Sequence, residues 1–156
     1  MWMLVRMMKL QMDYEFIVDV YVKEVRLLLE YGSVVFHSGL TKKESNEIEN
    51  VQRQFLSSLS FHLNVGLTYS EARICFGLDL LSERRLDQCY TYVRKHLDRT
   101  GGGKTSDLFK LRNRISERTR DKTFIEPQYK STRFYQNPLN FLTRVANEIM
   151  RDKVKT

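Results

Sequence analysis

Along most of this sequence, apolar residues recur every three or four positions, which is the spacing of one face of an α-helix. The clearest stretch is residues 86–97, whose apolar stripe consists of Leu86, Cys89, Tyr90, Val93 and Leu97. No segment shows the strict alternation of polar and apolar residues that is typical of a half-buried strand. The sequence therefore predicts a mainly α protein: a helical bundle, a basic and partly irregular C-terminal segment, and a final helix.

The first long periodic segment covers residues 16–36 and predicts one continuous amphipathic helix that ends at Ser38 and Gly39. Its expected buried face is formed by Ile17, Val20, Tyr21, Leu28, Tyr31 and Val35. Charged residues occupy the segment at Asp19, Lys23, Glu24, Arg26 and Glu30. These charges exclude a membrane-spanning helix here.

Local signals mark where further helices begin. Thr41 and Thr68 are each followed three residues later by a glutamate, the pattern of a capping box, and Gly77 is expected to end the second of these helices. The first helix has an apolar stripe at Ile48, Val51, Phe55 and Leu59. Asn137 followed by Pro138 predicts the start of a last helix, with its stripe at Leu142, Val145, Ala146 and Ile149.

These signals suggest three segments along the chain. Residues 1–99 are expected to form a helical domain, residues 100–136 a basic linker or extended segment, and residues 137–156 a C-terminal helix. Three consecutive glycines open the middle segment and are typical of a flexible linker. Within it we expect irregular chain, with a short helix around residues 107–114.

Charge is distributed unevenly between the two halves of the chain. The formal net charge is +7, which favours polyanionic partners, and the excess of cations lies in residues 81–156, whereas residues 1–80 are slightly acidic. The candidate nucleic-acid-binding residues are Arg84, Arg85, Arg94, Lys95, Arg112, Arg114, Arg118 and Arg120. Nearby aromatic residues, including Phe109, Phe124, Phe134 and Tyr135, suit a surface that stacks bases while cations neutralise the backbone. The alternative is a solvated basic surface with these aromatic residues in a small core.

Sites of other kinds are not supported. Residues 101–105 end like a phosphate-binding loop, but Asp98 stands where that motif needs a glycine. The histidines and cysteines lack the close spacing of zinc ligands, and no carboxylates are paired as two-metal catalysis requires. We therefore expect no catalytic residue, metal or cofactor. Two cysteines without a secretory signal indicate a reduced intracellular protein, cytoplasmic or nuclear.

Several blocks of this sequence resemble the region after the catalytic palm in reverse transcriptases of non-LTR, LINE-type retrotransposons. The first is LEYGSVVFHSGLTK at residues 29–42, followed by IENVQ at 48–52. Similar blocks are YSEA at 69–72, LDLLSERR at 78–85, and TRFYQNP with FLTR at 132–138 and 141–144. The family's paired catalytic aspartates match nothing here.

The resemblance implies a C-terminal, thumb-like part of an RNA-directed DNA polymerase that is not catalytic alone. One partner would be RNA or DNA, which it would bind through phosphates without regard to base sequence. The other would be the missing palm domain. Within the matched blocks, the resemblance implies that Arg84 and Arg85 contact the nucleic acid. The other candidate cations are inferred from their charge alone. Arg84 and Arg85 have another interpretation, as helix-surface ion pairs with Glu83 and Asp87.

A second hypothesis concerns the apolar segment from Trp2 to Leu10. If this helix is exposed, the chain is a helical protein-interaction module whose apolar N-terminal helix seeks a partner.

Overall fold

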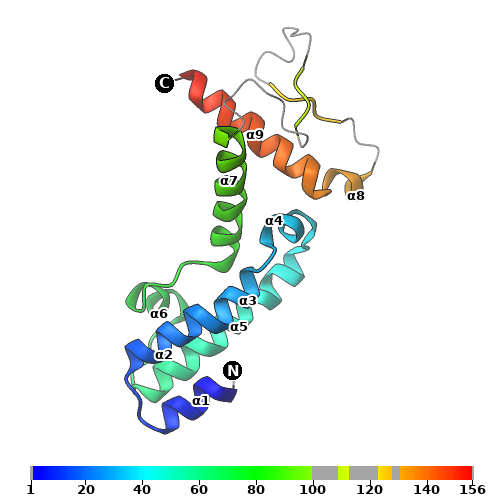
Figure 1. Ribbon diagram of the computed structural model, residues 1–156. Coiled ribbons are helices and arrows are strands. Elements are labelled where there is room, and N and C mark those ends of the chain that lie inside the picture. Colours follow the sequence, from blue (N-terminus) through cyan, green and yellow to red (C-terminus); the bar gives the residue numbers. More distant parts are fainter. Residues whose placement is uncertain (1, 100–108, 113–122, 128–130, 156) are drawn as a thin grey trace. The chain divides into compact units, whose positions relative to one another are not determined.

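The computed structural model describes residues 2–99, 109–112, 123–127 and 131–155, and helices dominate these residues (Figure 1). The predicted mainly α fold is confirmed, and no strand forms within the described residues. The α-helices are α1 (Trp2–Lys9), α2 (Tyr14–Val20), α3 (Leu27–Glu30), α4 (Ser33–Phe36), α5 (Lys42–His62), α6 (Tyr69–Cys75), α7 (Leu81–Arg99), α8 (Thr132–Tyr135) and α9 (Pro138–Lys155). A π-helical segment, η1 (Tyr21–Arg26), lies between α2 and α3, and a 3₁₀ turn, η2 (His37–Gly39), follows α4.

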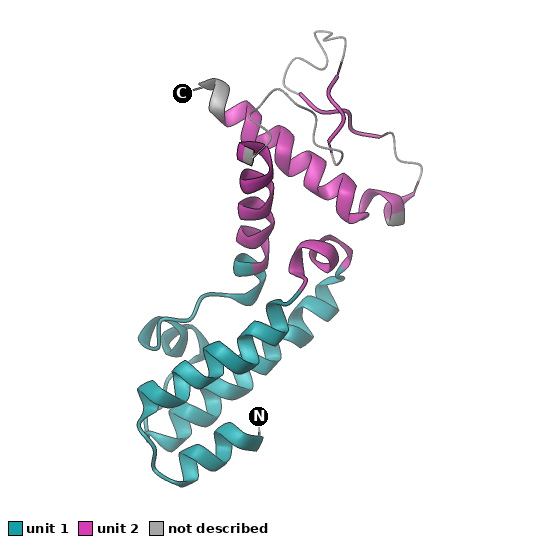
Figure 2. Cartoon of the chain, viewed as in Figure 1, with its two compact units in different colours: residues 1–31, 40–84 teal, residues 32–39, 85–156 magenta. Residues whose placement is uncertain are grey.

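The chain divides into two compact units (Figure 2). Unit 1 contains residues 1–31 and 40–84, and unit 2 contains residues 32–39 and 85–156. The chain passes between the units three times: after Tyr31, after Gly39 and, within α7, between Arg84 and Arg85. The three segments expected from composition describe a different division of the sequence and stay a prediction.

The core of unit 1 is built from α1, α2, η1, α5 and α6. Leu4 and Met8 of α1 are buried together with Ile17, Phe55 and other apolar residues of this core. The ring of Tyr21 stacks on that of Phe55, with centroids 4.0 Å apart. Phe55 and Leu59 are buried as predicted, whereas Ile48 and Val51 are only half-buried because the packed face of α5 also includes Glu49, Gln52 and Leu56.

Both predicted capping boxes are confirmed. Thr41 accepts a hydrogen bond from the backbone N–H of Glu44, and the Glu44 carboxylate accepts one from the backbone N–H of Thr41. Thr68 and Glu71 make the same pair of bonds at the start of α6. Each box satisfies N–H groups that a helix start would otherwise leave without partners.

A hydrogen-bonded cluster of polar side chains, the polar hub, lies in the interior of unit 1. The Glu49 carboxylate accepts hydrogen bonds from the Tyr69 hydroxyl and, at 3.0 Å, from the backbone N–H of Leu81. Gln52 donates to the Tyr69 hydroxyl at 3.3 Å and accepts from the Tyr21 hydroxyl at 3.2 Å. Burial, followed by the bond to Glu49, raises the pKa of Tyr69 to about 12, so the hydroxyl stays protonated as a donor. The hub thereby fixes η1, α5, α6 and the start of α7 in one alignment.

The prediction of one continuous helix over residues 16–36 is wrong. The π-helical η1 has about one more residue per turn than an α-helix, so residues after it are rotated relative to the predicted face. Leu28 and Tyr31 are consequently 76% and 83% exposed, although both were expected in the core. Val35, expected there too, lies beyond Gly32 in unit 2 and is also exposed. Gly32 then ends the helical path in the left-handed region at φ +71°, which glycine adopts without strain.

The core of unit 2 is formed mainly by α7 and α9. The predicted stripes on both helices are buried: Cys89, Val93, Leu97, Leu142, Val145, Ala146 and Ile149. Two members of the predicted α7 stripe differ: Leu86 is exposed, and Tyr90 is half-buried. The Asn137 side chain accepts a hydrogen bond from the backbone N–H of Leu139 at 3.0 Å, as expected for the residue that caps α9.

Part of the basic middle segment is also described. Leu111 and Phe124 form an antiparallel bridge, with backbone hydrogen bonds from Arg112 to Thr123 and from Ile125 to Lys110. Residues 109–112 are therefore extended, and the helix expected around residues 107–114 is wrong at these positions. The Asn147 side chain both donates to and accepts from the backbone of Phe124, which anchors the bridge to α9.

Candidate nucleic-acid interface

Arg94 and Lys95 are the sequence-predicted cations that α7 exposes to solvent. In the part of the chain that the structure describes, no carboxylate lies within ion-pair distance of either side chain. Lys95 lies on the side of α7 opposite the buried stripe of Cys89, Val93 and Leu97, and Arg94 lies at the flank of that stripe. Both charges are therefore available to a ligand.

The surroundings of these two cations differ. On a helix, residues three or four apart are neighbours, so Arg94 lies beside Tyr90 and Asp98. The Tyr90 hydroxyl donates to the Glu148 carboxylate at 2.5 Å, and this bond is the main reason that the pKa of Tyr90 rises to about 12. Arg94 thus has anionic groups nearby, which offset part of its attraction for a phosphate.

Lys95 has an aromatic neighbourhood instead. Tyr92, one turn before it, is exposed, and its ring lies nearly parallel to that of His96 at a centroid distance of 5.9 Å. His96 in turn meets the buried ring of Phe109 edge-on. This packing holds Tyr92 beside Lys95, so one side of α7 offers both a cation and an exposed ring.

Arg84, which belongs to unit 1, is held in an ion pair. Its guanidinium donates to both carboxylate oxygens of the buried Glu30, at 2.5 and 3.1 Å, although the two residues are 54 positions apart. Arg26 approaches the same carboxylate at 4.0 Å, and Asp79 lies 3.9 Å from Arg84. Burial, and secondarily the charge of Arg84, lowers the pKa of Arg26. Arg84 therefore helps hold η1 and α3 to the start of α7.

Arg85 is fully buried in unit 2. Burial and, to a smaller degree, the charge of Arg85 lower the pKa of His37, so the two side chains share one environment. A guanidinium in this position does not face solvent. The sequence contains the signal for it, because Arg85 lies four residues before Cys89 and eight before Val93, on the same helix face.

The remaining predicted cations lie in the middle segment. Arg112 is half-buried on the extended chain that pairs with Thr123, and Lys110, two residues before it, is exposed. Arg114, Arg118 and Arg120 lie outside the described residues. The aromatic residues Phe109 and Phe124 are buried in the core of unit 2, whereas Phe134 and Tyr135 are exposed.

One contact of this region was not predicted from sequence. The Arg144 guanidinium lies over the ring of Tyr135, 3.7 Å from its centroid, and donates to the Tyr135 carbonyl at 3.3 Å. A cation on an aromatic face is attracted by the ring quadrupole. Through these contacts Arg144 holds α8 against α9.

Among the described residues, no group of three histidine, cysteine or carboxylate side chains is arranged to hold a metal ion. Cys75 is exposed and Cys89 is buried, and burial raises the pKa of the Cys89 thiol to about 11. No helix in the same set of residues is long and apolar enough to cross a membrane.

Comparisons of the chain with models of protein families, with curated proteins and with solved structures gave no match.

Proposed function

We propose that this chain binds RNA or DNA through phosphates, without regard to base sequence, as the C-terminal, thumb-like part of a non-LTR reverse transcriptase. The proposal is supported by the resemblance of residues 29–42 and 78–85 to that family, by the helical fold and by the excess of cations after residue 80. The observation that carries it is the pair of exposed cations, Arg94 and Lys95, on the outer face of α7.

In this proposal the cations have different roles. Arg94 and Lys95 neutralise phosphates and release condensed counterions, which supplies affinity but no base discrimination. Lys95 contributes more, because Tyr92 offers a ring for stacking beside it, whereas Arg94 has anionic neighbours. Arg84 and Arg85 act indirectly, since ion pairing and burial engage them inside the fold.

The test is the salt dependence of binding to a fluorescently labelled RNA–DNA duplex, measured by anisotropy. For about four phosphate contacts, log K should fall against log[salt] with a slope of about −3 to −4. The double variant Arg94→Glu, Lys95→Glu should weaken binding and reduce the slope by about 2, since each lost contact removes about 0.9.

The matched control reverses two exposed lysines of unit 1, Lys42→Glu with Lys43→Glu, which changes the net charge by the same amount. If the duplex binds at α7, this control variant should keep most of the slope of log K against log[salt]. Equal losses in both variants would mean that net charge alone attracts the duplex. A slope near zero for the unaltered chain would contradict phosphate binding altogether.

The proposal assigns no polymerase activity to this chain alone. Primer extension on a poly(A) template with the purified chain is expected to give no product. Template-dependent product would require a catalytic centre that the proposal does not contain.

A further inference from the structure

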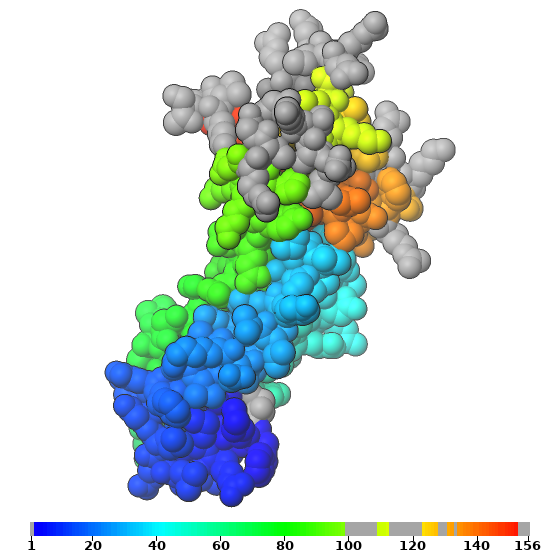
Figure 3. Space-filling view, viewed as in Figure 1, coloured from blue at the N-terminus to red at the C-terminus, as the bar shows by residue number. Residues whose placement is uncertain are grey.

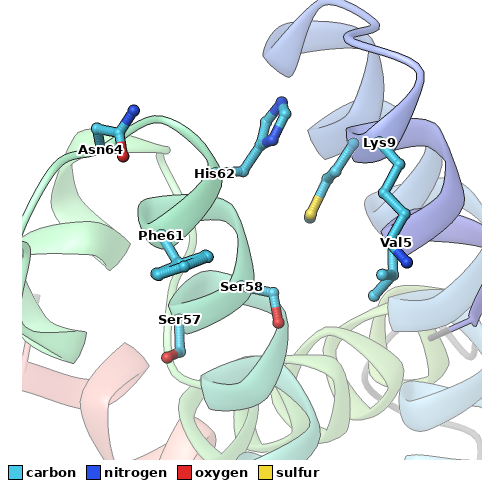
Figure 4. Close-up of a pocket in the computed structure, with 8 residues that line it drawn as sticks. Val5, Lys9, Ser57, Ser58, Phe61, His62 and Asn64 are labelled. Carbon is cyan, nitrogen blue, oxygen red and sulfur yellow. The ribbon is translucent and has the colours of Figure 1, made fainter.

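Unit 1 contains a groove between α1 and the C-terminal end of α5, with a volume of about 590 Å³ (Figure 4). Val5 and Lys9 line it from α1, and Phe61 and His62 line it from α5. A smaller hollow of about 290 Å³ is bordered by Trp2, Val5, Arg6 and Lys9. The two hollows share Val5 and Lys9 and so adjoin along α1; together they are called the depression below.

The apolar residues of this depression are turned toward solvent. Phe61 is 85% exposed and Trp2 is 74% exposed, although Leu4 and Met8 of the same helix α1 are buried in the core. In Figure 3, α1 (dark blue) lies at the surface of unit 1. Large exposed apolar side chains around a concave surface are typical of a protein-interaction site.

The charge of the depression is of one sign. The cations that line the two hollows are Arg6 and Lys9, and among the described residues no carboxylate lines either of them. This contrasts with residues 1–80 as a whole, in which acidic residues outnumber basic ones. An apolar groove with a purely cationic rim fits a partner that combines apolar anchors with carboxylates.

We propose that this depression binds a short amphipathic helix of another protein, whose apolar face contacts Val5 and Phe61 and whose acidic residues meet Arg6 and Lys9. The eight residues of α1 span about 12 Å, which matches about two turns of a helix with anchors at i, i+3, i+4 and i+7. Ser57, Ser58 and Asn64 add hydrogen-bonding groups to the lining, which a folded peptide can use.

The probe for this site is a labelled synthetic helix of about four turns, with Leu at the anchor positions and Glu on the polar face. A second peptide carries Lys in place of each Glu. Anisotropy with the full chain is expected to show that the Glu peptide binds at least roughly tenfold more tightly than the Lys peptide. Trp2, the single tryptophan, should change its emission on binding.

Two variants locate the peptide, and each has a control matched in exposure and chemistry. Phe61→Ser should weaken binding by roughly tenfold, whereas Ile74→Ser, at a site on α6 that is 80% exposed, should not. Lys9→Gln should weaken binding by roughly fivefold, whereas Lys42→Gln should not. Because Phe61 and Lys9 are exposed, unchanged circular dichroism is expected for both variants.

Several results would overturn the proposal. One is that the Glu and Lys peptides bind equally well. Another is that the Arg94→Glu, Lys95→Glu variant no longer binds the peptide, which would place the peptide on unit 2. A concentration-dependent dimer that Phe61→Ser abolishes would make a second copy the occupant. Binding of phosphatidylserine vesicles that depends on Phe61, with no peptide bound, would assign the surface to membranes. None of these results depends on whether the chain binds nucleic acid.

Discussion

Unit 1 and unit 2 use different interactions in their interiors. Unit 1 buries two carboxylates, Glu30 and Glu49, and supplies them with hydrogen bonds from residues far apart in sequence. The core of unit 2 is mainly an apolar seam between α7 and α9 and buries no carboxylate among the described residues, although it also contains the buried guanidinium of Arg85 and Asn147, which contacts the bridge segment. Buried hydrogen bonds fix which groups meet, whereas an apolar seam tolerates small shifts. We therefore expect unit 1 to respond more strongly to the loss of a single polar group.

The largest effect is expected from Glu49→Ala in unit 1. The change leaves the Leu81 N–H and the Tyr69 hydroxyl without their acceptor, and should lower the free energy of unfolding by about 3 kcal/mol. Hydrogen exchange measured by segment should show faster exchange in α5 and α6 than in α9. Glu47→Ala, at an exposed position of α5, should change stability by at most about 0.5 kcal/mol. Equal acceleration in α9 would show that the units unfold together.

The next effect concerns the ion pair of unit 1. Arg84→Met removes the bidentate partner of buried Glu30 and should cost about 2 kcal/mol. Adding Glu30→Leu removes the buried charge, so the double variant should recover to within about 1 kcal/mol of the original stability. Urea denaturation of the four proteins gives the coupling energy. Additive losses would mean that the pair is not an energetic unit.

Each unit contains one cysteine, and the two should respond differently to alkaline pH. Burial raises the pKa of Cys89 in the folded chain from 9.0 to about 11, so folding favours the protonated thiol. Its contribution, about 2 kcal/mol, is present in full below pH 9 and is lost as the pH rises to about 11. Denaturation measured at pH 8 and at pH 11 should show that Cys89→Ala loses less unfolding free energy between these pH values than the original chain does. Cys75→Ala, at an exposed site, should lose as much unfolding free energy over this pH range as the original chain. Equal losses in the two variants would contradict the role assigned to Cys89.

The smallest of these effects is expected from Asn147→Ala in unit 2. The change removes the side-chain partner of the buried Phe124 backbone and should cost about 1.5 kcal/mol. Its effect should appear as faster exchange of the Phe124 amide, with α5 unaffected. Asn46→Ala, at an exposed position of α5, is the control and should be close to neutral. A cost above that of Glu49→Ala would reverse the ranking of the two units.

Features that depend on neighbours in sequence could be predicted. The capping boxes at Thr41 and Thr68 involve groups three residues apart, and the stripes of α7 and α9 follow helical spacing. The pairing of Glu30 with Arg84 and the polar hub could not be predicted, because they join residues brought together only by tertiary folding. The π-helical η1 was missed for the same reason: its extra residue per turn depends on packing rather than on local pattern.

The candidate interface was only partly accessible from sequence. The exposure of Arg94 and Lys95 follows from their places outside the buried stripe of α7. The prediction from charge that Arg85 contacts nucleic acid does not fit its burial. A long cationic side chain can be buried when its helix face points inward. The groove beside α1 was not predicted, since it needs the approach of α5 to the first helix.

The π-helical segment also determines how this chain tolerates changes in length. A π turn is equivalent to one surplus residue in an α-helix. We expect that removing the codon for the exposed Glu24 converts η1 to an ordinary α-helical turn, with Glu30 still directed into the interior of unit 1. A one-residue deletion in the middle of α5 would instead rotate half of that helix by about 100° and turn its core residues away. We therefore expect η1 to tolerate the loss of one codon at a smaller cost than the middle of α5.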